Sequence, residues 1–307
     1  MSDIYDSAFR TLLNDCSKLI LPLINEMFGE HYTGNERIDF YPNEHFISQQ
    51  TDGELKRITD TNFAVDNGKV RKKYHWECQS TPDSRMLIRL FEYDAQIALD
   101  DGVCGVESLT VEFPNSAVLY LRSAKKTPDN YRYIIKTPGG TVSYSVPVMK
   151  VKAYSLDDIF SKKLLLLIPF FIFTFEADFP KYEADAEKLN ALKAEYQTIL
   201  QKLEQMEQND EIGEFDRLTI LELSDEVVKS LASKYQNVLK GVEDTMMGPI
   251  IETRVKKMWT EGRKEGMLSF ALDMVKSGLL SIKDAAARLG MSEDAFKEQF
   301  AAFSAQS

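Results

Sequence analysis

Two strand-like runs, residues 57–65 and 70–80, flank the dipeptide Asn67-Gly68. Asn-Gly is typical of the two-residue turns that join antiparallel strands, because both residues tolerate a positive φ there. The sequence therefore predicts a β-hairpin, and no other feature of the chain restricts its fold as strongly. A two-residue turn would place Asp66 opposite Lys69 and Asp60 opposite His75.

Helical spacing of apolar residues predicts a helix over residues 4–29 that ends at Gly29, and another over residues 84–99. Residues 30–56 are predicted to form a loop or short irregular elements, and everything from Ser155 onward is predicted to be helical. Three more segments have strand-like sequences: residues 116–122, 131–137 and 141–151. This order predicts an α/β core followed by an all-helical C-terminal region.

Composition is that of a globular protein: 44% of the 307 residues are hydrophobic and 28% are charged. The three cysteines lack CxxC spacing, which disfavours a disulfide framework or a structural zinc site and favours a cytoplasmic protein. The first residues do not have the pattern of a secretory signal. The most apolar run, residues 164–175, contains Pro169 and is shorter than the ~20 residues that a membrane span needs. We expect it to be a buried core segment, and we expect no membrane association.

Charge is distributed unevenly, since residues 176–226 contain 15 acidic and 5 basic residues of a chain whose net charge is −11. We expect this segment to be a solvated helical surface that faces away from nucleic acid. Residues 189–206 carry an apolar seam at alternating spacings of three and four. The seam would pack against residues 221–238 in a helical hairpin, or against a second copy in a homodimer. The predicted domains are residues 1–175, 176–248 and 249–307.

The hairpin also gathers candidate functional residues. Side chains alternate along a strand, so His75, Glu77 and Gln79 share one face and Cys78 lies on the other. In the predicted register Asp60 is a diagonal neighbour of Glu77, with Cβ atoms ~7 Å apart. Two solvated carboxylates at that distance, with the main-chain carbonyl of Cys78, could bind Mg²⁺ or Mn²⁺ and activate a water molecule. The alternative is the polar face of an edge hairpin with two unrelated acids.

Residues 57–100 resemble the Rpn family of recombination-promoting nucleases, a branch of the PD-(D/E)XK nuclease superfamily. The match is carried by the run Glu77-x-Gln79-Ser80-Thr81-Pro82-Asp83 and by Met86, Arg89 and Tyr93 after it. The opening Asp6-x-x-Phe9-Arg10 and the later Glu261-Gly262-Arg263-Lys264-Glu265-Gly266 are also similar to the family. The resemblance covers the first two-thirds of the chain best.

The resemblance implies a PD-(D/E)XK core, which is a mixed sheet flanked by helices, and a role for each matching residue. Asp60 and Glu77 match the two metal-binding acids, although Thr59 replaces the proline of the superfamily motif. Gln79 stands where many superfamily members have lysine, and glutamine is usual in this branch. It lacks the charge that would stabilise the transition state, but it can orient water or a phosphate oxygen.

Basic residues near the hairpin are candidates for DNA contacts. Arg89 would contact phosphate, or it would pair with an acid such as Asp83. Lys72 and Lys73 alternate across the strand, so only part of this cluster can face DNA. We expect His75 to be a hydrogen-bonded neighbour of the site rather than a catalytic group.

Near the C-terminus, residues 281–303 predict two short helices, the second capped by Ser292. This unit is either a helix-turn-helix that binds DNA or a packing and oligomerisation element; the acids of its second helix favour packing. The leading functional hypothesis is a Mg²⁺-dependent DNA endonuclease in recombination or mobile-element biology. The alternatives are a non-catalytic DNA-binding or protein-interaction module that keeps the nuclease fold, and a nuclease that acts on RNA.

Overall fold

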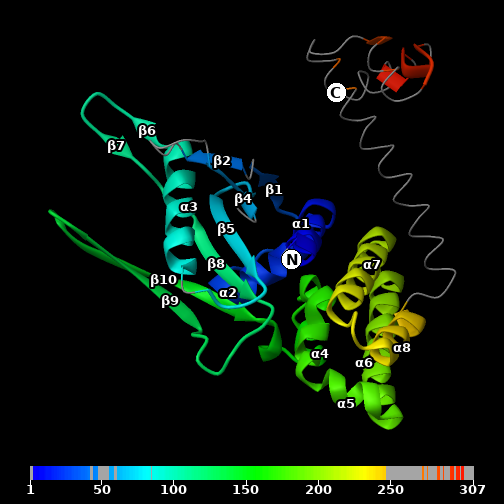
Figure 1. Cartoon of the computed structure of the whole chain (residues 1–307). Helices are drawn as coiled ribbons and strands as arrows, with labels where there is room; N and C mark the ends of the chain where they lie inside the picture. The colour runs from blue at the N-terminus through cyan, green and yellow to red at the C-terminus, as the bar shows by residue number, and fades with distance from the viewer. Residues whose placement is uncertain are drawn as a thin grey trace. The chain divides into compact units, whose positions relative to one another are not determined.

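The computed structural model describes residues 3–41, 44–47, 55–58, 61–83 and 85–246. In the C-terminal region it describes residues 272, 275, 282, 283, 286, 291–293, 295–297, 299 and 300. The chain divides into two compact units, residues 1–247 and 248–307 (Figure 1).

The N-terminal helical segment consists of two α-helices where one was predicted. Helix α1 (Asp3–Asp15) and helix α2 (Ile20–Phe28) are separated by a short 3-10 turn, Ser17–Leu19. Gly29 ends α2 with φ of +67°, a left-handed conformation that favours glycine, so the predicted stop is confirmed.

A six-stranded mixed sheet forms the centre of the first unit, in the order β1-β4-β5-β8-β10-β9. Its strands are β1 (Arg37–Phe40), β4 (Thr61–Asp66), β5 (Arg71–Gln79), β8 (Asn115–Tyr120), β9 (Asn130–Thr137) and β10 (Gly140–Lys150). Strands β5, β8 and β10 are parallel to one another, and the other pairs are antiparallel. The predicted α/β class with a mixed sheet is confirmed.

Four short strands were not predicted. The segment of residues 30–56, expected to be a loop or irregular, contains β1 and β2 (Glu44–Ile47), and β2 pairs with β3 (Leu55–Ile58) in a separate two-stranded sheet. A second two-stranded sheet joins β6 (Val103–Cys104) to β7 (Leu109–Thr110). Each is too short for a recognisable period of two, so its pairing is decided by the neighbouring strand.

The predicted hairpin is present, but its predicted register is wrong. Asp66 pairs with Arg71, and Asn62 rather than Asp60 pairs with His75. The turn is centred on Gly68 and Lys69 rather than on Asn67 and Gly68, since the N–H of Asn67 donates to the carbonyl of Val70 (3.3 Å) and Gly68 has a φ of +80°. The Asn67 side-chain oxygen accepts hydrogen bonds from the N–H groups of Lys69 (3.0 Å) and Val70 (2.9 Å). The shift is two positions, so the alternation of faces along β5 is unchanged. Asp60 itself lies outside the described residues.

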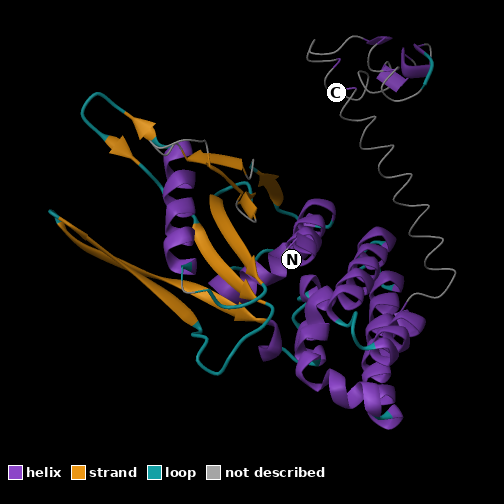
Figure 2. Ribbon diagram, in the orientation of Figure 1, coloured by secondary structure: helices purple, strands orange, loops and turns teal. Residues whose placement is uncertain are grey.

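Helices cover both faces of the sheet (Figure 2). Helix α3 (Met86–Asp100) packs on one face, where Met86 and Leu90 join a cluster with Val118, Tyr120, Tyr133, Val146 and Val148. On the other face, Phe28 of α2 contacts the rings of Tyr74 and Trp76. Polar residues of β5 that lie under α3 are therefore enclosed between helix and sheet.

Beyond the sheet the first unit is helical, as predicted. A 3-10 helix, Leu165–Thr174, contains Pro169, and its residues from Leu165 to Phe173 are all buried, which confirms the predicted core segment. It is preceded by α4 (Leu156–Ser161) and followed by α5 (Phe179–Ala184), α6 (Ala186–Gln208), α7 (Glu214–Leu231) and α8 (Gln236–Met246). In the described parts of the chain, no helix has the length and apolar character that crossing a membrane requires.

The apolar seam of α6 is buried inside the chain. Its residues Leu192, Tyr196, Ile199 and Leu203 are at most 1% exposed, and α6 packs against α8 and α7. Helix α7 in turn contacts α1 and the buried 3-10 helix. The intramolecular arrangement therefore accounts for the seam without a second copy of the chain.

The described residues of the second unit form a small apolar core around Leu272, Ala286 and Phe296. Ser292 accepts a hydrogen bond from the N–H of Ala295 at 3.2 Å, which confirms the predicted cap of the last helix.

Candidate functional site

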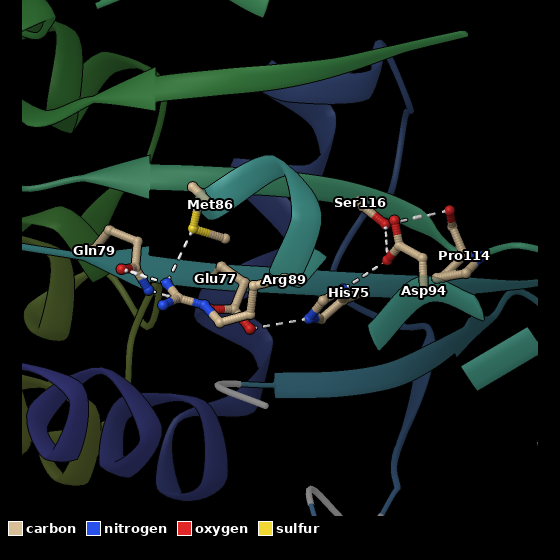
Figure 3. Close-up of polar contacts among 8 residues, drawn as sticks. All are labelled: His75, Glu77, Gln79, Met86, Arg89, Asp94, Pro114 and Ser116. Carbon is tan, nitrogen blue, oxygen red and sulfur yellow. Dashed lines mark hydrogen bonds and ion pairs between the residues drawn. The ribbon is translucent and has the colours of Figure 1, made fainter. Parts of the chain in front are cut away.

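Six polar side chains form a continuous hydrogen-bonded chain between β5, β8 and α3 (Figure 3). We call them the polar chain: Ser116, Asp94, His75, Glu77, Gln79 and Arg89. The hydroxyl of Ser116 donates to Asp94 Oδ1 (2.6 Å), and His75 Nδ1 lies 2.7 Å from the same oxygen. His75 Nε2 lies 3.2 Å from Glu77 Oε1. Gln79 Nε2 donates to Glu77 Oε2 (3.1 Å), and Arg89 Nη2 donates to Gln79 Oε1 (2.8 Å).

The strand geometry explains this order. His75, Glu77 and Gln79 alternate onto the α3 face of β5, as predicted, while Cys78 is buried on the opposite face. The end of the polar chain at Gln79 lies where the parallel strands β5 and β8 end, since Gln79 pairs with Tyr120 and its carbonyl accepts the N–H of Leu121. Ligands of open α/β sheets commonly bind beyond this carboxyl end of parallel strands.

His75 is completely buried between two carboxylates. Burial lowers the pKa of His75, but its hydrogen bonds with Asp94 and Glu77 raise it by more, so the net pKa rises to about 9. At neutral pH the ring is therefore a cation, and both of its nitrogens donate. His75 is hydrogen-bonded, as expected, but it is more than a neighbour, because it fixes one oxygen of Glu77.

Glu77 is only 2% exposed, so the expectation of a solvated acid is wrong for this residue. Its two oxygens accept hydrogen bonds from His75 and Gln79, which compensate for the loss of water. Helix α3 covers this stretch of β5, and the sequence of the hairpin alone does not indicate that a helix packs there. The orientation of Glu77 is consequently set from both sides.

Arg89 connects the buried part of the polar chain to the surface. Its side chain is 32% exposed, and its guanidinium contacts Gln79 and, at 3.5 Å, Asp83. The predicted alternative of an ion pair with Asp83 is thus present. Gln79 is held by Glu77 on one side and Arg89 on the other, so its amide has a fixed orientation.

Asp94 and Ser116 were not predicted as part of the site. The signal for Asp94 was available, because it lies four residues after Leu90 and four before Ala98, on the buried stripe of α3. A buried acid on an apolar stripe needs a partner. Ser116 had no comparable signal, since its position beside Asp94 results from the pairing of β8 with β5.

The predicted metal ligands are only partly described. Glu77 is in place, Asp60 lies outside the described residues, and the Cys78 carbonyl points away from β8, because alternation places it opposite that of Gln79. Within the described residues, no group of three or more His, Cys, Asp or Glu side chains is arranged to hold a metal ion.

The two lysines predicted to bind DNA each have an acidic partner. Lys72 forms an ion pair with Glu30 after α2, and Lys73 forms one with Asp101 at 2.6 Å after α3. They lie on opposite faces of β5, as the alternation predicted. Both charges are balanced within the chain.

Comparison of the chain with protein-family models, with curated proteins and with solved structures gives no match.

Proposed function

We propose that this chain is a metal-dependent DNA endonuclease of the PD-(D/E)XK type, with a role in recombination or mobile-element biology. The observation that carries the proposal is the pair Glu77 and Gln79, whose side chains are hydrogen-bonded at the carboxyl end of β5. The resemblance of residues 57–100 to the Rpn family supports the same assignment. In this proposal Glu77 is a metal ligand and Gln79 orients water or a phosphate oxygen.

The donor set suits a hard divalent cation. Asp60, Glu77 and the main-chain carbonyl of Cys78 would hold Mg²⁺ or Mn²⁺ with oxygen ligands. A carboxylate has about four lone-pair positions, and Glu77 uses two of them for His75 and Gln79, so it can still bind a cation. When bound, the metal would activate water and neutralise charge on the phosphate.

The protein's own residues would position the reacting groups. His75, held by Asp94, acts through Glu77 and is a positioning residue. Arg89 holds the amide of Gln79, so that the side chain is ordered before a substrate arrives. The partly exposed guanidinium of Arg89 is the member of the polar chain that we expect to meet a phosphate.

A second candidate function is a non-catalytic DNA-binding module that retains the fold. It is favoured by the burial of Glu77 and by the bonds that already occupy both of its oxygens. Both candidates bind DNA, and only the first one cuts it.

Incubation of the purified protein with supercoiled plasmid and Mg²⁺, Mn²⁺ or EDTA separates the two. We expect nicking with metal and none with EDTA, and we expect Glu77→Gln and Asp60→Asn to abolish it. Glu77→Gln is preferred to alanine, because glutamine keeps the side-chain volume and an oxygen that can accept the hydrogen bond of His75, whereas alanine would leave a buried donor without an acceptor. Unchanged cutting by both variants refutes the site. A gel shift of DNA without any cutting by the wild-type protein supports the second candidate.

A further inference from the structure

A basic segment follows β8 in this acidic protein. Residues 122–152 contain seven basic residues and a single acid, Asp129, although the whole chain has a net charge of −11. The segment includes the loop with Lys125 and Lys126 and the antiparallel pair β9–β10. Such a local excess of positive charge favours an anionic partner.

The pair β9–β10 forms a two-stranded ribbon that projects from the sheet (Figure 1). The hydroxyl of Tyr133 attaches the ribbon to α3 by donating to the carbonyl of Leu87 at 3.0 Å. Pro138, in the turn, is five positions after Tyr133, so the ribbon reaches about 17 Å beyond this contact at about 3.3 Å per residue. Val142, in the projecting part, is 59% exposed.

The two faces of the ribbon differ. One face continues the apolar packing near α3 with Tyr133 and its cross-strand partner Tyr144. The other, which we call the basic face, consists of exposed residues: Arg132, Ile134, Lys136, Thr141, Ser143 and Ser145. It combines two cations with three hydroxyl groups and contains no acid, which is the set of side chains that binds phosphate oxygens.

The cations of the basic face are not balanced within the described chain. Arg132 donates to the hydroxyl of Ser143 at 3.3 Å. Among the described residues, neither Arg132 nor Lys136 forms an ion pair, and the same is true of Lys125 and Lys126. This contrasts with Lys72 and Lys73, whose charges are met by acids of the chain.

Strand β10 ends at the same edge of the sheet as Gln79. Lys150, at the end of β10, pairs with Tyr120, and Tyr120 pairs with Gln79. The loop with Lys125 and Lys126 begins after Arg122, whose N–H donates to the carbonyl of Ser80 at 3.2 Å. The loop with Lys125 and Lys126 is therefore the part of the basic segment that lies near the end of the polar chain, whereas the basic face lies on the side of the sheet opposite to α3.

We propose that the β9–β10 ribbon binds the backbone of duplex DNA through its basic face, with Lys125 and Lys126 adding contacts at its base. The inference takes its partner from the proposed function. A two-stranded ribbon fits the major groove of B-form DNA, which is about 12 Å wide. The major groove of duplex RNA is too narrow and deep to admit it, so duplex DNA is the partner that the shape selects.

The test is equilibrium binding of a fluorescein-labelled 25-base-pair DNA duplex in EDTA, measured by anisotropy over a range of salt concentrations. Arg132→Gln with Lys136→Gln should reduce the slope of log K against log salt by about 2, at about 0.9 per phosphate contact. At 0.1 M salt this corresponds to roughly 60-fold weaker binding. The matched control is Lys181→Gln with Lys188→Gln, two exposed lysines of the acidic segment, which changes the net charge equally and should leave binding unchanged.

Unchanged affinity of the ribbon variant, or equal loss in the control, would overturn the proposal, and so would equal or tighter binding of duplex RNA by the wild-type protein. An unchanged circular dichroism spectrum and melting temperature would show that the ribbon variant is folded. The plasmid assay with Mg²⁺ keeps the two proposals apart. Glu77→Gln should bind DNA like the wild-type protein without cutting it, and loss of binding in the ribbon variant supports the ribbon even if the wild-type protein never cuts.

Discussion

The charge of His75 predicts a specific loss of stability at alkaline pH. In the folded protein the pKa of His75 is raised to about 9, while in the unfolded chain it has its ordinary value of 6.5. A pKa that is higher in the folded state stabilises the protein fully below the unfolded pKa, and this stabilisation disappears as the pH rises through the folded pKa. The whole effect amounts to roughly 3 kcal/mol, of which about 2 kcal/mol is lost between pH ~7.5 and ~9.5.

Urea denaturation at a series of pH values measures this loss. The chain has two tryptophans, and Trp76 is completely buried beside His75. A Trp259→Phe background leaves Trp76 fluorescence as the reporter of core unfolding. The pH window is chosen above the titration of Glu222, whose pKa burial and the neighbouring Glu226 and Asp225 raise to about 7.

Two controls identify His75 as the source. His75→Gln should lower stability at neutral pH and remove the loss between pH ~7.5 and ~9.5, whereas His31→Gln, at an exposed position, should retain it. If His75→Gln does not fold, NMR titration of the three histidines in the otherwise wild-type protein gives the pKa directly. A His75 resonance that titrates near or below 6.5 refutes the assignment of an imidazolium between two carboxylates.

Two further predictions concern the polar chain and the helical core. Gln79→Ala should lower the cleavage rate by ~10²-fold, the range of a lost positioning contact, and leave metal affinity in calorimetry unchanged; lost metal binding would make Gln79 a ligand instead. Ile199→Ala should destabilise the protein by ~2–5 kcal/mol, because it opens a cavity in the seam of α6, and light scattering should show the same mass before and after the substitution. A change in oligomeric state would mean that the seam also contacts a second copy.

The hairpin shows how far sequence reasoning reaches and where it ends. Asn67-Gly68 identified a turn between two strands, because local backbone preference is encoded in those two residues. In the structure the turn is centred one residue later, on Gly68 and Lys69, where the Asn67 side chain accepts the N–H groups of Lys69 and Val70. Since both outcomes are compatible with the same dipeptide, the pairing of His75 with Asn62 could be read only from the structure.

The residues that β5 contributes to the candidate site could be predicted from the sequence, but the contacts that α3 makes with them could not. Alternation placed His75, Glu77 and Gln79 on one face because that rule needs only the identity of the strand. The burial of Glu77 depends on the cover by α3, and the charge of His75 depends on Asp94 of that helix, which lies 19 residues after His75 in the sequence. A contact between a strand and a helix that are distant in the sequence produces no short-range sequence pattern, apart from the acid on the apolar stripe of α3.

The inner and outer members of the polar chain have different roles: the inner members contribute to stability, and the outer member is placed to contact a ligand. Its inner members, Ser116, Asp94 and His75, are buried and have a fixed set of bonds, so substitutions there act on folding and on the orientation of Glu77. Its outer member, Arg89, is partly exposed at the edge where β10 ends and where the loop with Lys125 and Lys126 begins. The ribbon supplies charge that the chain does not neutralise, whereas Lys72 and Lys73 already have partners. We therefore expect affinity for DNA to depend on the ribbon and DNA cleavage to depend on Glu77. A substitution in the ribbon should leave cleavage measurable, and a substitution of Glu77 should leave DNA binding measurable.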